Sequence, residues 1–246
     1  MRQPGAIAPG LIINYKLERC EKLCIFADNN ANNNANAMAS NTITIYATSP
    51  NQRFVDQAAD TLRNGGIIVY PTDTLYALGC DALNKNAIQR LCRLKGLDPE
   101  RNLLSVVCSG IGMAAEYARI DNTAFRMLKQ HLPGPFTFIL PASTRLPKVF
   151  KNRKTVGIRI PDNAIAAAIS EALGGPILTT SVNVGAFDSA EDATNAEAIA
   201  QVYGRQVDLI VDGGQGGTTP SAIVDLATDG SDSPTVLREG PRQIQL

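Results

Sequence analysis

The segment from residue 65 to residue 81, GGIIVYPTDTLYALGCD, constrains the fold more than any other part of the chain. Its β-branched and aromatic run predicts a buried strand at residues 67–70. Pro71 ends this strand, because proline has no backbone N–H to give to a sheet. Two hydroxyl side chains, Thr72 and Thr74, follow at once. Polar groups held at the end of a rigid strand are typical of a small-molecule site.

Helical and strand patterns interleave along the rest of the chain, and several strands follow each other without a helix between them. The apolar spacing predicts helices at 54–62, 84–96, 121–132, 163–173 and 195–203, and further strands at 42–46, 103–108, 136–140, 156–160, 177–180, 207–211, 222–226 and 235–238. In the third helix we expect Phe125 and Leu128 to face inward. This order predicts an α/β (α+β) fold, an open, twisted, mixed sheet with flanking helices.

The domain organisation follows from a change of composition near residue 41. Residues 28–37 are almost all asparagine and alanine, with nothing to bury, so we expect residues 1–41 to be a disordered low-complexity segment. Residues 42–246 contain neither a repeat nor a linker, and 44% of the whole chain is apolar. We therefore predict a single domain from 42 to 246.

Charge and cysteine content exclude several classes of protein. The 23 basic and 23 acidic side chains cancel, so any contact with nucleic acid must come from a local patch. No apolar run approaches the roughly 20 residues that cross a bilayer, so we expect no membrane contact. Scattered cysteines favour buried, reduced thiols and a cytoplasmic location: they are Cys20, Cys24, Cys80, Cys92 and Cys108.

The common catalytic signatures are absent. There is no phosphate-binding Gly-x-x-x-x-Gly-Lys-Ser/Thr loop, no Gly-x-Ser-x-Gly elbow and no pair of histidines on a helix. The single histidine, His131, falls at a predicted helix C-terminus, where the helix dipole explains it. Cys20 and Cys24 have no partners with which to bind a metal, so we predict no metal site in the protein itself.

What remains is a set of hydroxyl, amide and cationic side chains near the predicted ends of strands and helices. They are Thr72, Lys95, Thr137, Arg159, Ser181, Asn183 and Arg238. Such groups hold phosphates and carboxylates rather than act as covalent nucleophiles. Ordinary turn chemistry is the alternative explanation for each residue taken singly, because Thr, Ser and Asn are common in turns.

A basic run without acidic residues lies between residues 142 and 160. It contains Arg145, Lys148, Lys151, Arg153, Lys154 and Arg159. A polyanion such as RNA would feel this local field, so the first five are candidate RNA-binding residues. A solvated loop with charges for solubility is the alternative, and the lack of neighbouring aromatic residues argues against single-strand stacking.

Eight pieces of sequence, in order from residue 65 to residue 240, resemble the YrdC-like family. They are Tyr-Pro-Thr-Asp-Thr at 70–74, Gly-Cys-Asp at 79–81, Lys95 after a helix, Pro-Gly-Pro-x-Thr at 133–137, Val-Gly-Ile-Arg-Ile-Pro at 156–161, Thr-Ser-x-Asn at 180–183, Pro-Ser-Ala-Ile-Val-Asp at 220–225 and Leu-Arg-Glu-Gly at 237–240. The resemblance implies an open twisted sheet with a large, concave, positively charged cavity.

The resemblance also implies an activity, that of a threonylcarbamoyl-AMP synthase. Such an enzyme joins L-threonine, bicarbonate and ATP, with Mg²⁺ on the phosphates, and releases pyrophosphate. A separate threonylcarbamoyl transferase complex then modifies tRNA. The roles implied for this chain are substrate binding by Thr72, Arg159 and Ser181, and ATP binding by Lys95, Thr137, Ser181, Asn183 and Arg238.

One residue departs from the family pattern. Synthases carry Lys-x-Arg where this chain has Lys95, Gly96 and Leu97, a departure similar to the YciO-like branch. Arg101 stands four residues on and is the candidate replacement, so Lys95 and Arg101 are the predicted catalytic residues. The alternative is a relative that binds a nucleotide or double-stranded RNA and makes no adenylate.

The missing cation gives a first testable prediction. If Arg101 replaces it, Leu97→Arg raises the rate of adenylate synthesis and Arg101→Ala lowers it by about 10²- to 10³-fold, the usual cost of one preorganised charge donor. Pyrophosphate release measures both rates. Unchanged rates in both variants would show that Arg101 does not supply this charge.

Overall fold

The computed structural model describes residues 41–98, 102–151, 154–227 and 234–245, with the backbone alone at residue 151. These residues belong to one compact unit. The predicted low-complexity segment lies outside the described residues, apart from its last position. In the described part of the chain, no helix is long and apolar enough to cross a membrane.

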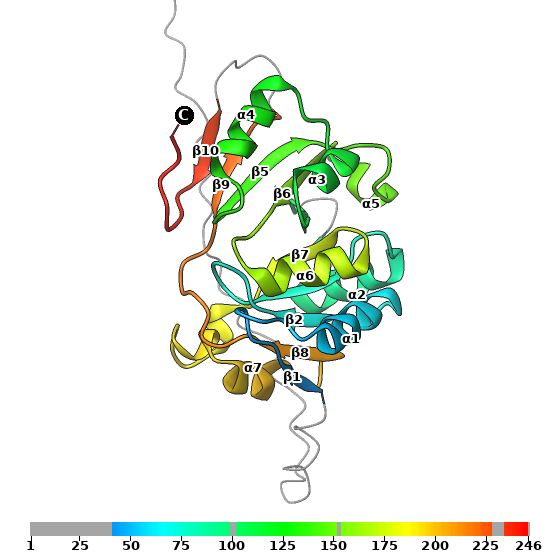
Figure 1. Ribbon diagram of the computed structural model, residues 1–246, viewed down its shortest axis with the longest axis vertical. Helices are drawn as coiled ribbons and strands as arrows, with labels where there is room; N and C mark the ends of the chain where they lie inside the picture. Colours follow the sequence, from blue (N-terminus) through cyan, green and yellow to red (C-terminus); the bar gives the residue numbers. More distant parts are fainter. Residues whose placement is uncertain (1–40, 99–101, 152–153, 228–233, 246) are drawn as a thin grey trace, which may run out of the picture. The chain divides into compact units, whose positions relative to one another are not determined.

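The described residues form one open, mixed sheet of ten strands (Figure 1). The strands are β1 (Thr42–Thr44), β2 (Ile68–Tyr70), β3 (Ala77–Asp81), β4 (Ser105–Val107), β5 (Phe136–Pro141), β6 (Thr155–Arg159), β7 (Ile177–Ser181), β8 (Leu209–Asp212), β9 (Ala222–Asp225) and β10 (Thr235–Arg238). Their order across the sheet is β1-β8-β2-β3-β7-β4-β6-β5-β9-β10. Parallel and antiparallel pairs mix, which confirms the predicted fold class.

Helices connect these strands, and asparagine caps begin most of them. They are α1 (Gln52–Arg63), α2 (Lys85–Lys95), α3 (Ile111–Tyr117), α4 (Asn122–His131), α5 (Lys148–Lys151), α6 (Ala164–Leu173) and α7 (Ala196–Tyr203), with short 3₁₀ turns η1 (Val184–Ala186) and η2 (Asp192–Thr194). The side chains of Asn51, Asn84, Asn163 and Asn195 each accept a backbone N–H of the first helical turn. The predicted helix at 84–96 begins with one of these caps, Asn84.

Two hydrophobic cores lie on opposite faces of the sheet, because neighbouring strand residues point to opposite sides. Ile68 of β2 belongs to the smaller core, with α1 and α6, whereas Val69 belongs to the larger core, with α2, α3, α4 and α7. The same alternation separates Val107 from Val106 in β4. Helices α1 and α6 therefore cover one face, and the other helices with core residues cover the opposite face.

The structure corrects three expectations from the sequence. Residues 77–81 form strand β3, which was not predicted because the hydroxyl-rich turn before it masks its pattern. Helix α3 was not predicted either. Phe125 was predicted to face inward, and this is wrong: its exposed fraction is 46%. Ala124 and Leu128 of α4 face the core at helical spacing, so Phe125 falls beside that stripe.

The two α4 positions give a matched pair for a stability test. Leu128 is fully buried, so Leu128→Ala is expected to lower the free energy of unfolding by about 2–5 kcal/mol. Phe125→Ala is expected to change it by at most about 0.5 kcal/mol, as for other exposed positions. Urea denaturation measures both. Equal losses in the two variants would contradict this orientation of α4.

Candidate anion-binding site

The turn from residue 71 to residue 76 is built by its own threonine hydroxyls. Thr72 Oγ1 donates to the carbonyl oxygen of Leu75 at 2.7 Å and accepts the Thr74 N–H at 3.1 Å. It also lies 3.0 Å from Thr74 Oγ1. Both threonines are buried. The hydroxyl run therefore folds the turn into a fixed shape, as local side-chain to backbone bonds do.

Arg159 ties this turn to the end of β6. Its Nη2 donates to Asp73 Oδ1 at 3.1 Å and to Thr74 Oγ1 at 2.9 Å. The side chains of Arg159 and Asp73 are only 6% and 8% exposed, so the pair is desolvated. The second carboxylate oxygen of Asp73 accepts the Asp162 N–H at 3.0 Å. Every strong acceptor of Asp73 is thus used by the protein itself.

The Nε atom of Arg159 is buried without a hydrogen-bond partner among the described residues. An unpaired buried polar group costs about 1–3 kcal/mol, and more when it is charged. A guanidinium N–H of this kind can be satisfied by an acceptor from a bound molecule. Because a guanidinium matches carboxylate and phosphate oxygens in shape and charge, an anion is the fitting partner.

A second guanidinium group, that of Arg238, lies close to the first. Burial, and then the charge of Arg159, lower the pKa of Arg238 below its ordinary value. Its Nε donates to the carbonyl oxygen of Ser221 at 2.9 Å, and Ser221 Oγ lies 2.9 Å from Thr137 Oγ1. A bound anion would offset the effect of burial and of Arg159 on the Arg238 guanidinium.

Small polar residues lie on the strands at and beside β6, the strand of Arg159. Ser105 of β4 pairs with Thr179 of β7 on one side and with Gly157 of β6 on the other. A Cβ atom on Gly157 would lie 2.4 Å from Ser105 Oγ and 3.0 Å from Thr137 Cγ2. Only glycine fits there. These paired residues share the face that α1 and α6 cover farther along the sheet, so one face carries both an apolar and a polar region.

Lys95 and Ser181 form a separate contact at the end of β7. Lys95 Nζ donates to the Ser181 carbonyl oxygen at 2.8 Å, and burial lowers the pKa of Lys95. The turn links this contact to the arginines, because Tyr76 O accepts the Val182 N–H at 2.9 Å. One turn therefore contacts both groups of predicted site residues.

Leu97, the residue that departs from the family pattern, has a structural role. Gly96 adopts the left-handed conformation that ends α2, with φ of 62°. The Leu97 N–H then bonds to the Cys92 carbonyl oxygen at 2.8 Å, and the leucine packs against the larger core. Leu97 thus adds no polar group beside Lys95. Arg101, which was predicted to supply the missing cation, lies outside the described residues.

The structure also places Asn183 and the basic run, whose predicted binding roles stay predictions. Asn183 is exposed, and its side-chain oxygen accepts the Gly185 N–H at 3.3 Å, so the structure uses it as the cap of η1. In the basic run, Arg159 is buried, whereas Arg145 is exposed and pairs with Glu116. Lys148 and Lys154 are exposed.

The remaining basic residues, Arg153 and the side chain of Lys151, lie outside the described residues. The cysteine expectation holds where it can be followed: Cys80, Cys92 and Cys108 are free and buried. Buried His131 closes α4, with its Nε2 accepting the Gln245 N–H at 3.2 Å.

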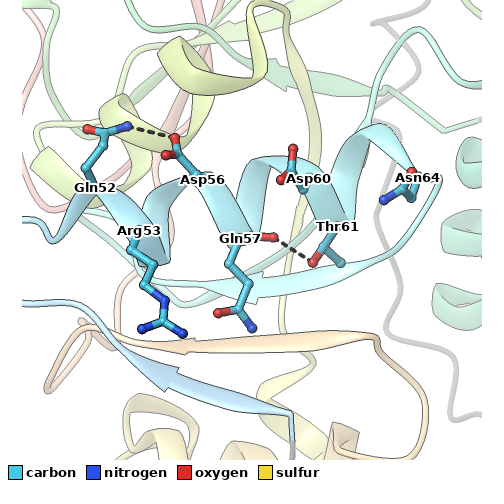
Figure 2. A pocket seen from close by; sticks show the side chains of 7 residues that line it. All are labelled: Gln52, Arg53, Asp56, Gln57, Asp60, Thr61 and Asn64. Carbon is cyan, nitrogen blue, oxygen red and sulfur yellow. Dashed lines mark hydrogen bonds between the residues drawn. The ribbon is translucent and has the colours of Figure 1, made fainter.

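Two hollows on the described surface are lined by residues other than the predicted site residues. One, of about 620 Å³, lies along α1 and is lined by Gln52, Arg53, Asp56, Gln57, Asp60, Thr61 and Asn64. Figure 2 shows that several of these side chains bond within their own helix, such as Gln52 to Asp56. The other, of about 450 Å³, is lined by residues of η1, η2 and α7. The large concave cavity implied by the resemblance stays a prediction.

With this geometry in place, comparison with known proteins defines the class. The family model Sua5/YciO/YrdC, described as "Telomere recombination", matches residues 60–240. The chain belongs to this family, which confirms the resemblance seen in the sequence.

Three members of the family are similar to this chain over most of its described length. The uncharacterized protein YciO of Escherichia coli K12 is 42% identical over 198 residues, 80% of this chain and 93% of that protein. Its crystal structure matches with a TM-score of 0.74, over 82% of this chain and 96% of that one. A threonylcarbamoyl-AMP synthase of Halorhodospira halophila is 34% identical, over 66% of this chain and 84% of its own length. P. abyssi Sua5 complexed with L-threonine is 30% identical with a TM-score of 0.72, over 81% of this chain and 57% of that one.

Sequence reasoning missed several residues that build the site. Asp73 and Ser221 were seen only as parts of motifs, although they hold Arg159 and Arg238. The signal for Asp73 was present, because it is the only carboxylate in a turn otherwise rich in hydroxyls. Ser105 and Gly157 carried no signal of this kind, since their role depends on the strand register.

The buried ion pair gives a stability prediction with a matched control. Asp73→Asn removes the countercharge of a buried guanidinium, so we expect the free energy of unfolding to fall by about 3–5 kcal/mol. Asp60→Asn breaks an exposed pair with Arg63 and should cost at most about 1 kcal/mol. Denaturant titration at neutral pH compares the two. Similar small losses would show that the Asp73–Arg159 pair is not an essential contact.

Proposed function

We propose that the protein is a threonylcarbamoyl-AMP synthase, which converts L-threonine, bicarbonate and ATP into threonylcarbamoyl-adenylate and pyrophosphate. The observation that carries this proposal is the arginine pair, with the buried Arg159 Nε free to bond an anion beside Arg238. The names of two relatives support the proposed activity, because one is a threonylcarbamoyl-AMP synthase and the other is complexed with L-threonine.

The chemistry suits a site without a histidine base. The threonine amine and bicarbonate give a carbamate and water, and a carbamate oxygen then attacks the α-phosphorus of ATP and displaces pyrophosphate. Positioning and charge neutralisation supply most of the acceleration in phosphoryl-type transfers. Fixed cations and hydroxyl donors meet that need.

Each polar group has a role in this proposal. Arg159 Nε binds the threonine carboxylate beside Thr72, and Lys95 neutralises bicarbonate or phosphate oxygens. Its lowered pKa, caused by burial, fits a lysine that gains a partner when an anion binds. Arg238 and Thr137 hold the phosphates, with Ser181 and Asn183 toward the rest of the nucleotide.

Mg²⁺ would arrive with ATP in this scheme. Among the residues that the structure describes, no three His, Cys, Asp or Glu side chains gather as metal ligands. Phosphate oxygens and water commonly supply most of the ligands of Mg²⁺ in such sites. The product would pass to a separate threonylcarbamoyl transferase complex for tRNA modification in the cytoplasm.

A second candidate is a relative that binds a nucleotide or double-stranded RNA without synthesis. Leu97 favours it, because this residue packs into the core where the synthase pattern has a cation. Exposed Lys148 and Lys154 offer charges to a phosphate backbone. Lys148→Glu with Lys154→Glu should weaken binding of a duplex RNA, and unchanged binding would remove this candidate.

The synthase proposal is tested by pyrophosphate release from ATP with bicarbonate, with and without L-threonine. We expect threonine-dependent release that Arg159→Lys lowers by about 10²- to 10³-fold, because lysine lacks the guanidinium fork. Arg63→Lys, at an exposed pair on α1, is the control and should leave the rate unchanged. No threonine-dependent release by the wild-type protein would reject the proposal.

A further inference from the structure

The segment from residue 213 to residue 221, here called the crossing loop, joins two distant strands. It runs from β8, second in the sheet order, to β9, ninth in that order. Figure 1 shows it in orange, rising past the strands that lie between. Because the loop contacts Thr74 and ends at Ser221, its position bears on the site.

Backbone hydrogen bonds dock the crossing loop on the turn at residues 71–76. The Gly217 N–H donates to the Thr74 carbonyl oxygen at 2.7 Å. Tyr76 Oη accepts the Gly213 N–H at 3.0 Å and donates to the Gly214 carbonyl oxygen at 2.6 Å. One tyrosine hydroxyl therefore satisfies two neighbouring peptide groups of the loop.

Glycines make this close docking possible. A Cβ atom on Gly213 would lie 2.5 Å from Pro71 Cγ, and one on Gly217 would lie 2.7 Å from the Thr74 carbonyl oxygen. On Gly216 it would lie 2.7 Å from the Tyr76 ring. Backbone and turn touch directly at all three positions, which only glycine permits.

The hydroxyl of Tyr76 stays protonated at neutral pH. The side chain is fully buried, and burial raises its pKa to about 12. A protonated phenol donates one hydrogen bond and accepts others, which is what the two peptide groups require.

The crossing loop contacts both halves of the arginine pair. Near its middle, Gly217 bonds to Thr74, whose hydroxyl accepts from Arg159. At its end, Ser221 accepts from Arg238 and contacts Thr137. A displacement of the loop would therefore change the separation of the two guanidinium groups.

We propose that Tyr76 is a positioning residue, which seats the crossing loop on the turn and so sets Arg238, the arginine that holds the phosphate chain, at its distance from Arg159. This inference rests on the proposed function in that the phosphate chain is that of the nucleotide. Tyr76 does not touch the reacting atoms. It acts through Gly213, Gly214 and the loop that ends at Ser221.

The test uses the full-length protein and inorganic pyrophosphate as the probe. Tyr76→Phe keeps the ring and removes the hydroxyl, so we expect the Gly213 amide to exchange with solvent at least about tenfold faster and pyrophosphate to bind about tenfold more weakly. Amide exchange by NMR and calorimetric titration measure these two effects. Tyr117→Phe, in the larger core, is the matched control and should change neither.

A second variant reaches the same contact from the loop. Gly217→Ala should push the loop from Thr74 and reproduce both effects, even if Tyr76→Phe fails to fold. Gly112→Ala is its control, because a Cβ atom there would meet nothing within 4 Å.

Each outcome decides the proposal. Faster exchange together with weaker pyrophosphate binding supports it. Unchanged exchange, faster exchange with unchanged affinity, or no pyrophosphate binding by the wild-type protein would overturn it. Failure of the proposed function is a different result, namely pyrophosphate binding without threonine-dependent turnover.

Discussion

The buried pair between Asp73 and Arg159 is the contact on which the site depends. It joins a turn after β2 to the end of β6, although β3, β7 and β4 lie between these strands. Two charges this far from water are stable only when further bonds satisfy them, and Thr74 and the Asp162 N–H provide those bonds. The pair holds the turn toward the polar region of the sheet. It also leaves the Nε–H of Arg159 without a partner in the described structure, and this N–H can donate a hydrogen bond to a bound anion.

The sheet combines two kinds of surface on one face, and the sequence of each strand explains the division. Where α1 and α6 pack, the strands supply apolar residues such as Ile68 and Ile177. Farther along the same face they supply the small or polar residues Ser105, Gly157 and Thr137, which do not belong to the smaller core. Hydrophobic burial thus fixes the scaffold, and the polar region of the same face is where polar ligands can be bound. The crossing loop then connects the ends of this region.

Much of the fold was predictable from the sequence, whereas several contacts that build the candidate site were not, for physical reasons that particular residues illustrate. The ends of α2 were predictable because capping is a local interaction: Asn84 begins the helix and Gly96 ends it. The strand before Pro71 was predictable from its apolar run. Phe125 was misjudged because helical periodicity does not say which edge of an apolar stripe meets the sheet. Strand β3 was missed because the turn before it masks its pattern. Asp73, Ser105 and Ser221 acquire their roles only through strand register and long-range contacts, which no local pattern encodes.

The central claim is that the buried, unpaired Nε–H of Arg159 binds an anionic ligand. The most direct measurement is the ¹H–¹⁵N resonance of this group, assigned by its loss in Arg159→Lys, during titration with L-threonine and a non-hydrolysable ATP analogue. The account predicts a downfield shift of the Nε proton that saturates with ligand, because a hydrogen bond to a carboxylate deshields it. A resonance that stays in place while L-threonine demonstrably binds would contradict the account.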